Sequence, residues 1–199
     1  MGAVQRPGLL WSQTSGSHTP APQRAGGTLE QRTLASLDDI TEAAAVVNCS
    51  GMGAALLAAD PELRPIQGQH VVVENPGITE FFSEDTGYSP ELVCTYPHGD
   101  TIVLGGTAIE DEYLAEAVEP AARGVVDRNA AIDPRLAKAR VIEHRVGQRP
   151  TRPEVRVEAD HRRAGTPVIH NYGHGGAGVT LSWGCAGEVA TLLAVQSEE

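Results

Sequence analysis

The sequence predicts a mixed α/β fold (equally describable as mixed α+β), and three observations support this. Short apolar segments with strand periodicity recur along the chain, separated by turns rich in Gly, Pro and Asn. Two longer segments have helical character, and no internal repeat is visible. The 199 residues are 41% hydrophobic, which is enough for a real core in one domain or in parts of two.

Charge and cysteine content narrow the class of protein. The formal net charge of -11 argues against nucleic acid or an anionic membrane as partner, because phosphate groups are bound by clustered Lys and Arg. No run of about 18 apolar residues and no secretory signal is visible. Cys49, Cys94 and Cys185 lie far apart and form no CxxC pair, and the histidines lack metal-ligand spacing. We therefore expect a cytoplasmic protein without a metal site or a disulfide framework.

The first third of the chain changes from a polar lead to apolar segments. Residues 1–27 are rich in Gly, Pro, Ser, Thr and Gln, and we expect them to be weakly ordered. Residues 28–34 have a strand pattern, and 44–51 read as a short buried strand that ends in a turn of small residues. Residues 52–59 predict a short helix.

The middle of the chain predicts a strand at 69–74, a hairpin and a long helix. Strands at 92–96 and 101–104 flank a loop that contains Gly99, which is a hairpin signal. Residues 110–129 predict a helix that begins at an acidic cluster and breaks at Pro120.

The region after this helix predicts two further strands around an arginine segment. Residues 140–146 and 154–158 have strand character on either side of 149–153. Pro150 and Pro153 stiffen the backbone around Arg149 and Arg152, and a rigid guanidinium grips a carboxylate well. The alternative is that these arginines pair with the many surplus carboxylates, which we favour for Arg152.

The most informative segment is the glycine loop near the C-terminus. A short apolar strand leads into Gly173-x-Gly175-x-x-Gly178, followed by an apolar helix that begins near Ala177. This pattern matches the dinucleotide fingerprint, but that fingerprint needs a second strand after the helix, and none follows here. A helix N-terminus presents unpaired N–H groups to a ligand with negative character.

Two readings of this loop differ in what the glycines do. They serve either as a tight strand-to-helix turn or as a surface where a ligand contacts the backbone directly. Two histidines and an Asn-Tyr pair in the same loop favour ligand contact. In the helix that follows, apolar residues at helical spacing predict a buried stripe. The stripe consists of Val179, Trp183, Ala186, Ala190 and Leu193.

Several of these segments resemble one enzyme family. Residues 170–180, with Trp183-Gly184-Cys185-Ala186 after them, closely resemble the C-terminal signature of the flavin-dependent D-amino-acid oxidases. Residues 149–156 resemble the family's arginine segment, 101–107 its substrate-domain strand, and 47–51 its flavin-domain strand. The resemblance covers roughly 28–194, with the motifs in the family's order.

The resemblance implies a domain plan, a cofactor and partners. The fold is expected to combine part of an FAD-binding domain with a mixed-sheet substrate domain. Residues 28–64 and 149–199 would belong to the FAD-binding part and 65–148 to the substrate domain. The implied cofactor is FAD, and the implied partners are a small D-amino acid and O2. A homodimer is one assembly that the resemblance leaves open.

The resemblance also implies roles for individual residues. Arg149 matches the arginine that binds the substrate α-carboxylate, and Gly176 the glycine whose carbonyl receives the amine. The active-site tyrosine corresponds to Cys94 if Pro97 aligns with the family's proline, and Tyr96 or Tyr88 would compensate after a local shift. The flavin contacts correspond to Cys49, Ser50, Gly51, Gly175, Gly176, Ala177, Gly178, Val179 and Thr180.

The implied reaction is oxidative deamination. Hydride transfer from Cα to FAD gives an imino acid that hydrolyses to a 2-oxo acid and ammonia, and O2 is reduced to hydrogen peroxide, with no general base required. One departure is that residues 1–27 lack the glycine fingerprint that holds the FAD diphosphate in this family. Two alternatives therefore stay open: a truncated, FAD-deficient remnant, or a related oxidase of glycine or N-methyl amino acids.

Overall fold

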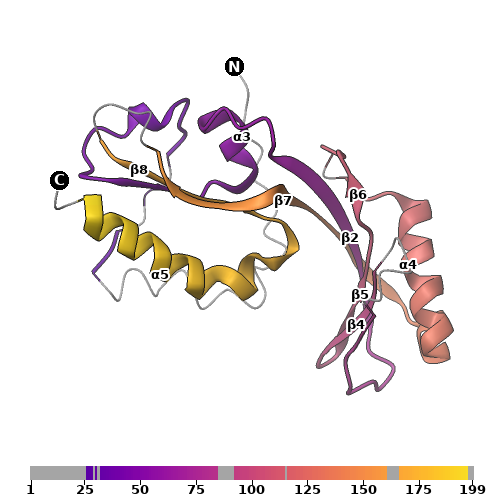
Figure 1. Cartoon of the computed structure of the whole chain (residues 1–199). Coiled ribbons are helices and arrows are strands. Elements are labelled where there is room, and N and C mark those ends of the chain that lie inside the picture. The colour runs from indigo at the N-terminus through magenta and orange to yellow at the C-terminus, as the bar shows by residue number, and fades with distance from the viewer. Residues whose placement is uncertain are drawn as a thin grey trace. The chain divides into compact units, whose positions relative to one another are not determined.

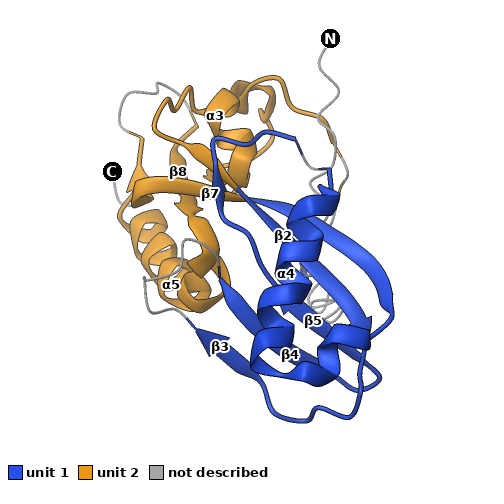
Figure 2. Ribbon diagram, turned by 90° about the vertical axis from the view of Figure 1, so that its right-hand side faces the viewer, with its two compact units in different colours: residues 1, 3–28, 67–148 blue, residues 2, 29–66, 149–199 orange. Residues whose placement is uncertain are grey.

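The computed structural model describes residues 26–28, 30, 32–84, 92–114, 116–160 and 166–196. It divides into two compact units, coloured separately in Figure 2. Unit 1 is built on Gln67–Gln148, and unit 2 on Leu29–Ile66 together with Arg149–Glu199. These boundaries lie beside the predicted ones at 64/65 and 148/149. The predicted lead 1–27 falls almost wholly outside the described residues.

Unit 1 is an antiparallel sheet covered by a helix. Its strands are β2 (Arg64–Glu74), β3 (Phe82–Glu84), β4 (Val93–His98), β5 (Thr101–Gly105) and β6 (Ile109–Glu110). They lie in the order β2-β5-β4-β3, with β6 beside β2. The predicted hairpin is confirmed, and Gly99 in its turn has φ +63°, which suits glycine.

The core of unit 1 lies between this sheet and α4 (Glu119–Ile132), which runs along β4 and β5 (Figure 2). A 3-10 turn, η3 (Pro134–Lys138), follows the helix. Asn129 of α4 is fully buried and donates to the carbonyl of Gly105 at 2.9 Å, while it accepts from Thr95 Oγ1 at 2.9 Å. The buried apolar side chains of the cluster are Val71, Val73, Ile78, Ile102, Leu104, Ala122, Val125 and Leu136.

The helix predicted over 110–129 begins later than expected. Residues 110–118 hold the end of β6, a turn at Asp111 with φ +55°, and further non-helical chain at every described position. Pro120 occupies the first turn of α4 instead of breaking a helix. A proline suits that position because the first-turn N–H groups have no partner within the helix.

The two strands predicted around the arginine segment form one long strand, β7 (Val141–Ala159), which extends through both units. Its register against β8 shifts between Thr151 and Arg156. The prolines at 150 and 153 lie at or near this irregularity, where a strand tolerates the loss of ladder N–H donors. The arginine segment therefore remains part of one continuous strand, although the pairing of β7 with β8 is interrupted there.

Unit 2 joins short parallel and antiparallel strand pairs to two helices. Strand β1 (Val46–Asn48) is parallel to β8 (Val168–His174), which is antiparallel to β7. After β1 come a 3-10 turn, η2 (Gly51–Gly53), and α3 (Ala54–Leu57), as predicted for 52–59. After β8 come η4 (Gly175–Ala177) and the long helix α5 (Gly178–Gln196), which packs along β8 (Figure 1).

The strand predicted at 28–34 is not formed at any described position of that range. The chain reaches a 3-10 turn, η1 (Leu37–Asp39), in which Ser36 and Asp39 make a reciprocal capping box. Leu37 then packs with Val46 and Val168 in a small apolar cluster. The local capping pattern therefore organises this segment, and sheet pairing does not.

The stripe predicted to be core on the last helix is exposed at four of its five positions, and only Leu193 is half-buried. Trp183 is 88% and Val179 60% exposed, and Val189 is the single buried residue of α5. Residues Gly175–Gln196 are long and apolar enough to cross a membrane by length and composition, so the predicted exclusion of a span does not hold on those criteria. One such helix is weak evidence of a span, because helices of soluble proteins pass the same test.

Candidate functional site

The candidate site lies in unit 2, where the carboxyl ends of two parallel strands meet. Cys49, Ser50 and Gly51 follow β1, and the glycine loop 173–178 begins in the last two residues of β8 and runs through η4 into α5. Ligands of α/β proteins commonly bind at this edge of a parallel sheet. Gly51 has φ +57°, and a Cβ there would lie 3.8 Å from Pro150 Cγ of β7. The fold therefore brings all three predicted segments together.

The glycine loop packs directly on the arginine segment of β7. Gly173 has φ +85°, and a Cβ there would lie 2.8 Å from Arg152 Cδ, closer than two such atoms approach. Gly175 has φ +54°, and its Cβ would lie 3.3 Å from Thr151 Oγ1. Both positions require glycine for conformation, and Gly173 also requires it for space.

Gly176 and Arg149 are neighbours at this surface. A Cβ on Gly176 would lie 3.6 Å from Arg149 Cδ, which is ordinary van der Waals distance. Gly176 is exposed and Arg149 is half-buried. A cation on a strand and a glycine backbone at a helix start thus stand side by side, which suits a small ligand with a carboxylate and an amine.

The loop ends in a helix start that no side chain caps. The 3-10 turn η4 runs into α5 at Gly178, one residue after the predicted start near Ala177. His174 precedes the turn and makes no side-chain cap. Burial lowers the pKa of His174, so its ring favours the neutral form. Gly176 and Ala177 of η4 are exposed, and the first N–H groups of a helical segment have no partner within it, so this position suits a ligand oxygen or an electron-rich ring.

A buried polar atom beside the loop has no partner in the described part of the protein. Asn171 Oδ1 is buried and makes no hydrogen bond. The side chain of Asn171 also hydrogen bonds the Cys49 thiol, whose pKa is raised by burial despite this bond. An orphaned acceptor costs free energy unless a donor reaches it, so Asn171 Oδ1 is an acceptor that a ligand N–H or O–H would satisfy. Together with the uncapped helix start and the exposed glycine backbone, these groups fit a flavin.

A charge cluster around Asp60 connects β8 and β7 next to the glycine loop. Asp60 Oδ2 accepts from Tyr172 Oη at 2.7 Å and lies 3.0 Å from Arg152 Nε and 3.4 Å from Arg156. Burial opposes the charge on Asp60, but the bonds from Tyr172 and the Glu62 N–H, with the two arginines, hold its pKa below the usual value. Arg152 also pairs with Glu62 at 2.5 Å. The prediction that Arg152 pairs with carboxylates of the protein is thus confirmed.

Tyr172 links this cluster to the loop, since it immediately precedes Gly173. It is 1% exposed, and burial together with the bond to Asp60 raises its pKa to about 12. The Arg156 guanidinium lies 5.6 Å from the centre of its ring. Tyr172 is therefore a neutral phenol that joins the strand β8 to Asp60.

A second polar chain supports the turn after β1. Asn48 accepts from the Ser50 N–H at 3.2 Å and from the Ser50 hydroxyl at 2.6 Å, and contacts His170 Nδ1 at 3.2 Å. The other ring nitrogen of His170 lies 3.4 Å from an Asp160 carboxylate oxygen. Burial and the nearby Arg156 lower the pKa of His170 despite the opposing effect of Asp160.

Sequence reasoning missed Asp60, Asn48 and Asp160 as supports of the site. Asn48 lay in the predicted flavin-domain strand but was assigned no role. Asp60 shows no local signal, because its partners lie in β7 and β8. A buried strand residue with a polar side chain, such as Asn48 or His170, was the available clue.

The remaining predicted site residue, Tyr96, lies in β4 of unit 1. It is 37% exposed, its hydroxyl donates to Ser83 Oγ at 3.4 Å, and its ring stacks on Phe81. Cys94 is buried opposite Gly105, where a Cβ would lie 2.1 Å from the sulfur. Tyr88, the other tyrosine considered, lies outside the described residues.

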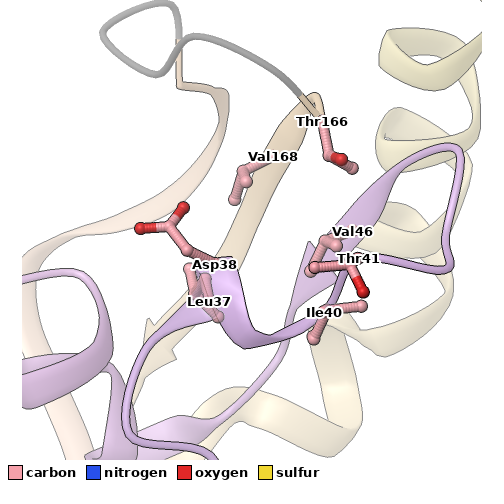
Figure 3. Close-up of a pocket in the computed structure, with 7 residues that line it drawn as sticks. All are labelled: Leu37, Asp38, Ile40, Thr41, Val46, Thr166 and Val168. Carbon is pink, nitrogen blue, oxygen red and sulfur yellow. The ribbon is translucent and has the colours of Figure 1, made fainter.

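A pocket of about 320 Å3 occupies a different place in unit 2 (Figure 3). Val46 and Val168, which pair at the amino ends of β1 and β8, lie on its wall. The glycine loop lies at the opposite, carboxyl end of β8. None of the predicted site residues lines this pocket, so it carries no support for ligand binding. The lining residues are Leu37, Asp38, Ile40, Thr41, Val46, Thr166 and Val168.

Comparison with known families gives one broad match. The family described as "DAO: FAD dependent oxidoreductase" matches residues 21–192. A D-amino-acid oxidase of Rubrobacter xylanophilus is 50% identical over 169 residues, which cover 84% of this chain and 52% of that protein. One from Streptomyces coelicolor is 47% identical over 168 residues, with the same two coverages. The chain thus spans about half the length of these relatives.

Solved structures show the same fold at lower identity. Glycine oxidase from Geobacillus kaustophilus matches with a TM-score of 0.65 at 22% identity, covering 75% of this chain and 41% of that one. L-proline dehydrogenase from P. horikoshii matches with a TM-score of 0.60 at 20% identity, covering 75% and 42%. At these identities the likeness establishes the fold alone.

Proposed function

The chain belongs to the DAO family of FAD-dependent oxidoreductases, and on this premise we propose that it carries the flavin-contacting and carboxylate-binding elements of a D-amino-acid oxidase. The reaction would convert a D-amino acid, O2 and water into a 2-oxo acid, ammonia and hydrogen peroxide. The observation that carries the proposal is the packing of Gly176 against Arg149 at the start of α5.

In this proposal the chain's own groups bind and orient the substrate. The Arg149 guanidinium takes the α-carboxylate through charge-assisted hydrogen bonds, and the Gly176 carbonyl accepts from the amine. Holding both ends fixes which face of Cα is presented, and such orientation supplies much of the catalysis. For Tyr96 of unit 1 we propose, on the resemblance alone, the role of the family's active-site tyrosine.

The cofactor would rest on the two turns that follow β1 and β8. When bound, FAD supplies the acceptor for the hydride from Cα and returns the electrons to O2. The uncapped N–H groups at the start of α5 favour negative character near them, and a helix N-terminus stabilises electron gain. The residues proposed to hold FAD are Cys49, Ser50, Gly51, Gly175, Gly176, Ala177, Gly178, Val179 and Thr180.

The proposal favours D-amino acids over glycine or N-methyl amino acids for one reason. The sequence relatives at 47–50% identity are D-amino-acid oxidases, whereas the likeness to glycine oxidase is a likeness of fold. A comparison of D-alanine, glycine and N-methylglycine as substrates separates these readings. The highest kcat/KM for D-alanine is expected, and a clear preference for glycine would replace the proposal.

The test of the proposal is whether the chain retains flavin and turns over. The purified 199-residue chain is incubated with FAD, dialysed, and examined for visible flavin absorbance and for peroxide formation with D-alanine. A yellow protein that forms peroxide is the expected result. A colourless protein without activity would show that this chain is an FAD-deficient remnant. A cytoplasmic location, the absence of membrane association and a homodimer stay predictions.

A further inference from the structure

The turn that carries Ser50 is tied to a buried histidine through one asparagine. Asn48 and His170 face each other across the parallel pair β1 and β8, 122 residues apart in sequence, and both are buried. No other described His of the protein is this deeply enclosed, since His170 is 1% exposed.

The hydrogen bonds determine which atoms face which. A backbone N–H can only donate, so the Asn48 atom that contacts the Ser50 N–H at 3.2 Å is the amide oxygen. The same oxygen accepts from the Ser50 hydroxyl at 2.6 Å. The Asn48 NH2 group therefore faces His170, and because it can only donate, Nδ1 of His170 is the acceptor.

This arrangement defines the state of the ring. With Nδ1 accepting, the neutral imidazole carries its proton on Nε2, which faces the Asp160 carboxylate at 3.4 Å. The other charged groups around the ring are Arg156 and Glu158 of β7, and the Tyr172 ring stands edge-on at 5.5 Å. A second proton on Nδ1 would meet the Asn48 NH2 group, and two donors would oppose each other.

We propose that His170 and Asn48 are positioning residues that hold the Ser50–Gly51 turn in its ligand-binding conformation, and that this hold is released when His170 takes a second proton. To accept a proton from the ring, Asn48 must turn its amide oxygen toward His170 and away from Ser50. The Ser50 N–H and hydroxyl then lose their shared acceptor, and the turn that begins with Gly51 at φ +57° loses its anchor.

The proposal rests on the proposed function only where it names the ligand as FAD. The coupling between His170 and Ser50 is a property of the chain itself. It is therefore measured first without cofactor, by NMR on the 199-residue protein, with His170→Gln used to assign the ring signals.

The first measurement follows the His170 ring and the Ser50 amide through a pH titration. The expected result is an Nε2–H tautomer at pH 8 and a Ser50 amide shift that moves with the same midpoint as the ring. An Nδ1–H tautomer, or a Ser50 amide that does not follow the ring, would overturn the proposal. His98→Gln, which changes an exposed histidine of the β4–β5 hairpin, is the matched control and should leave both signals unchanged.

The second measurement uses Asn48→Asp to remove the dependence on His170. A carboxylate at 48 accepts from the doubly protonated ring with one oxygen and from Ser50 with the other, so protonation of His170 no longer removes the acceptor from Ser50. FAD affinity, followed by flavin fluorescence, should fall about tenfold from pH 8 to pH 5 in the unchanged chain and stay nearly level over the same range in the variant. The same pH trend in both proteins would contradict the proposal.

The two measurements separate two kinds of failure. If no variant binds FAD at any pH, the proposed function fails for this chain, and the Ser50 titration still decides whether His170 controls the turn. If FAD binds with equal affinity at both pH values while Ser50 follows the ring, the turn is coupled to His170 but is not a cofactor contact, which also overturns the proposal.

Discussion

At the scale of the residue, the two arginines of the β7 segment have different surroundings. Arg152 is engaged by Asp60 and Glu62, and its stem covers Gly173. Arg149 packs beside Gly176 at the surface of the glycine loop. Arg152 thus supports the loop, and Arg149, three positions earlier on the same strand, is the arginine to which we assign the proposed ligand role.

Arg149→Ala tests the ligand role. In an FAD-loaded enzyme we expect the Michaelis constant for D-alanine to rise at least ~100-fold, since a bidentate charged contact contributes about 3 kcal/mol. Flavin absorbance should stay, because Arg149 is not itself one of the proposed flavin contacts. Arg149→Lys should recover only part of the loss, as lysine lacks the planar fork. An unchanged Michaelis constant would remove Arg149 from this role.

Asp60→Asn tests the buried charge cluster. The change leaves Arg152 and Arg156 beside a neutral group, and we expect a loss of about 3 kcal/mol in the free energy of unfolding at pH 7, by urea denaturation. The folded pKa of Asp60 is lowered, so its contribution is present above the ordinary value of 3.8 and is lost as the pH falls through the folded value. The difference between the two proteins should therefore shrink from pH 5 to pH 2.

A matched carboxylate-to-amide change controls for charge alone. Asp133→Asn removes the partly buried carboxylate partner of the exposed Arg135 in unit 1 and should cost less than about 1 kcal/mol. If Asp60→Asn costs no more than this control at pH 7, the cluster does not stabilise unit 2.

At the scale of the element, a glycine of the loop and a glycine of α5 have opposite effects on the free energy of unfolding. Gly173 stands at φ +85° against Arg152, whereas Gly184 in α5 has no atom within 4 Å of a Cβ position. The first glycine is required by the turn, and the second only weakens a helix.

Gly173→Ala and Gly184→Ala measure this contrast by thermal or urea unfolding. We expect Gly173→Ala to destabilise by about 2 kcal/mol or more, because a strained φ and a steric clash are added together. Gly184→Ala should stabilise by about 0.5–1 kcal/mol. A neutral Gly173→Ala would mean that the loop relaxes without cost and is not held by β7.

At the scale of the whole chain, α5 presents an apolar surface that the described residues leave uncovered. Trp183, Val179 and Leu181 are all exposed on this helix, within a stretch that is 6% buried. Large exposed apolar patches of this kind drive association. The net charge of -11 opposes close approach of two copies but does not shield the helix.

Trp183→Gln tests whether this surface governs the state of the protein in solution. We expect the 199-residue chain to self-associate, and the variant to shift toward monomer in size-exclusion chromatography with light scattering. Leu56→Gln, which removes another exposed apolar side chain from α3, is the control and should leave the distribution unchanged. A monodisperse monomer for the unchanged chain would contradict the prediction.

Features that depend on residues close together in the chain could be predicted from the sequence, and features that depend on distant residues could not. The hairpin at Gly99 and the glycine loop with its following helix depend on residues close in the chain, and their patterns were readable. The helix at 110–129 was misplaced because Pro120 was taken as a break, although proline also begins helices. Burial of the α5 stripe was wrong because periodicity reports an apolar face and not what covers it.

The sequence by itself determined the family, the order of its motifs and the presence of a glycine turn that leads into a helix, because these are carried by local patterns. The tertiary structure decided which polar groups support that turn: Tyr172 meets Asp60 across 112 residues, and His170 meets Asn48 across 122. Such pairs follow from the register of β1, β7 and β8. Strand register is set by the packing of the whole unit, so no local window of the sequence contains it.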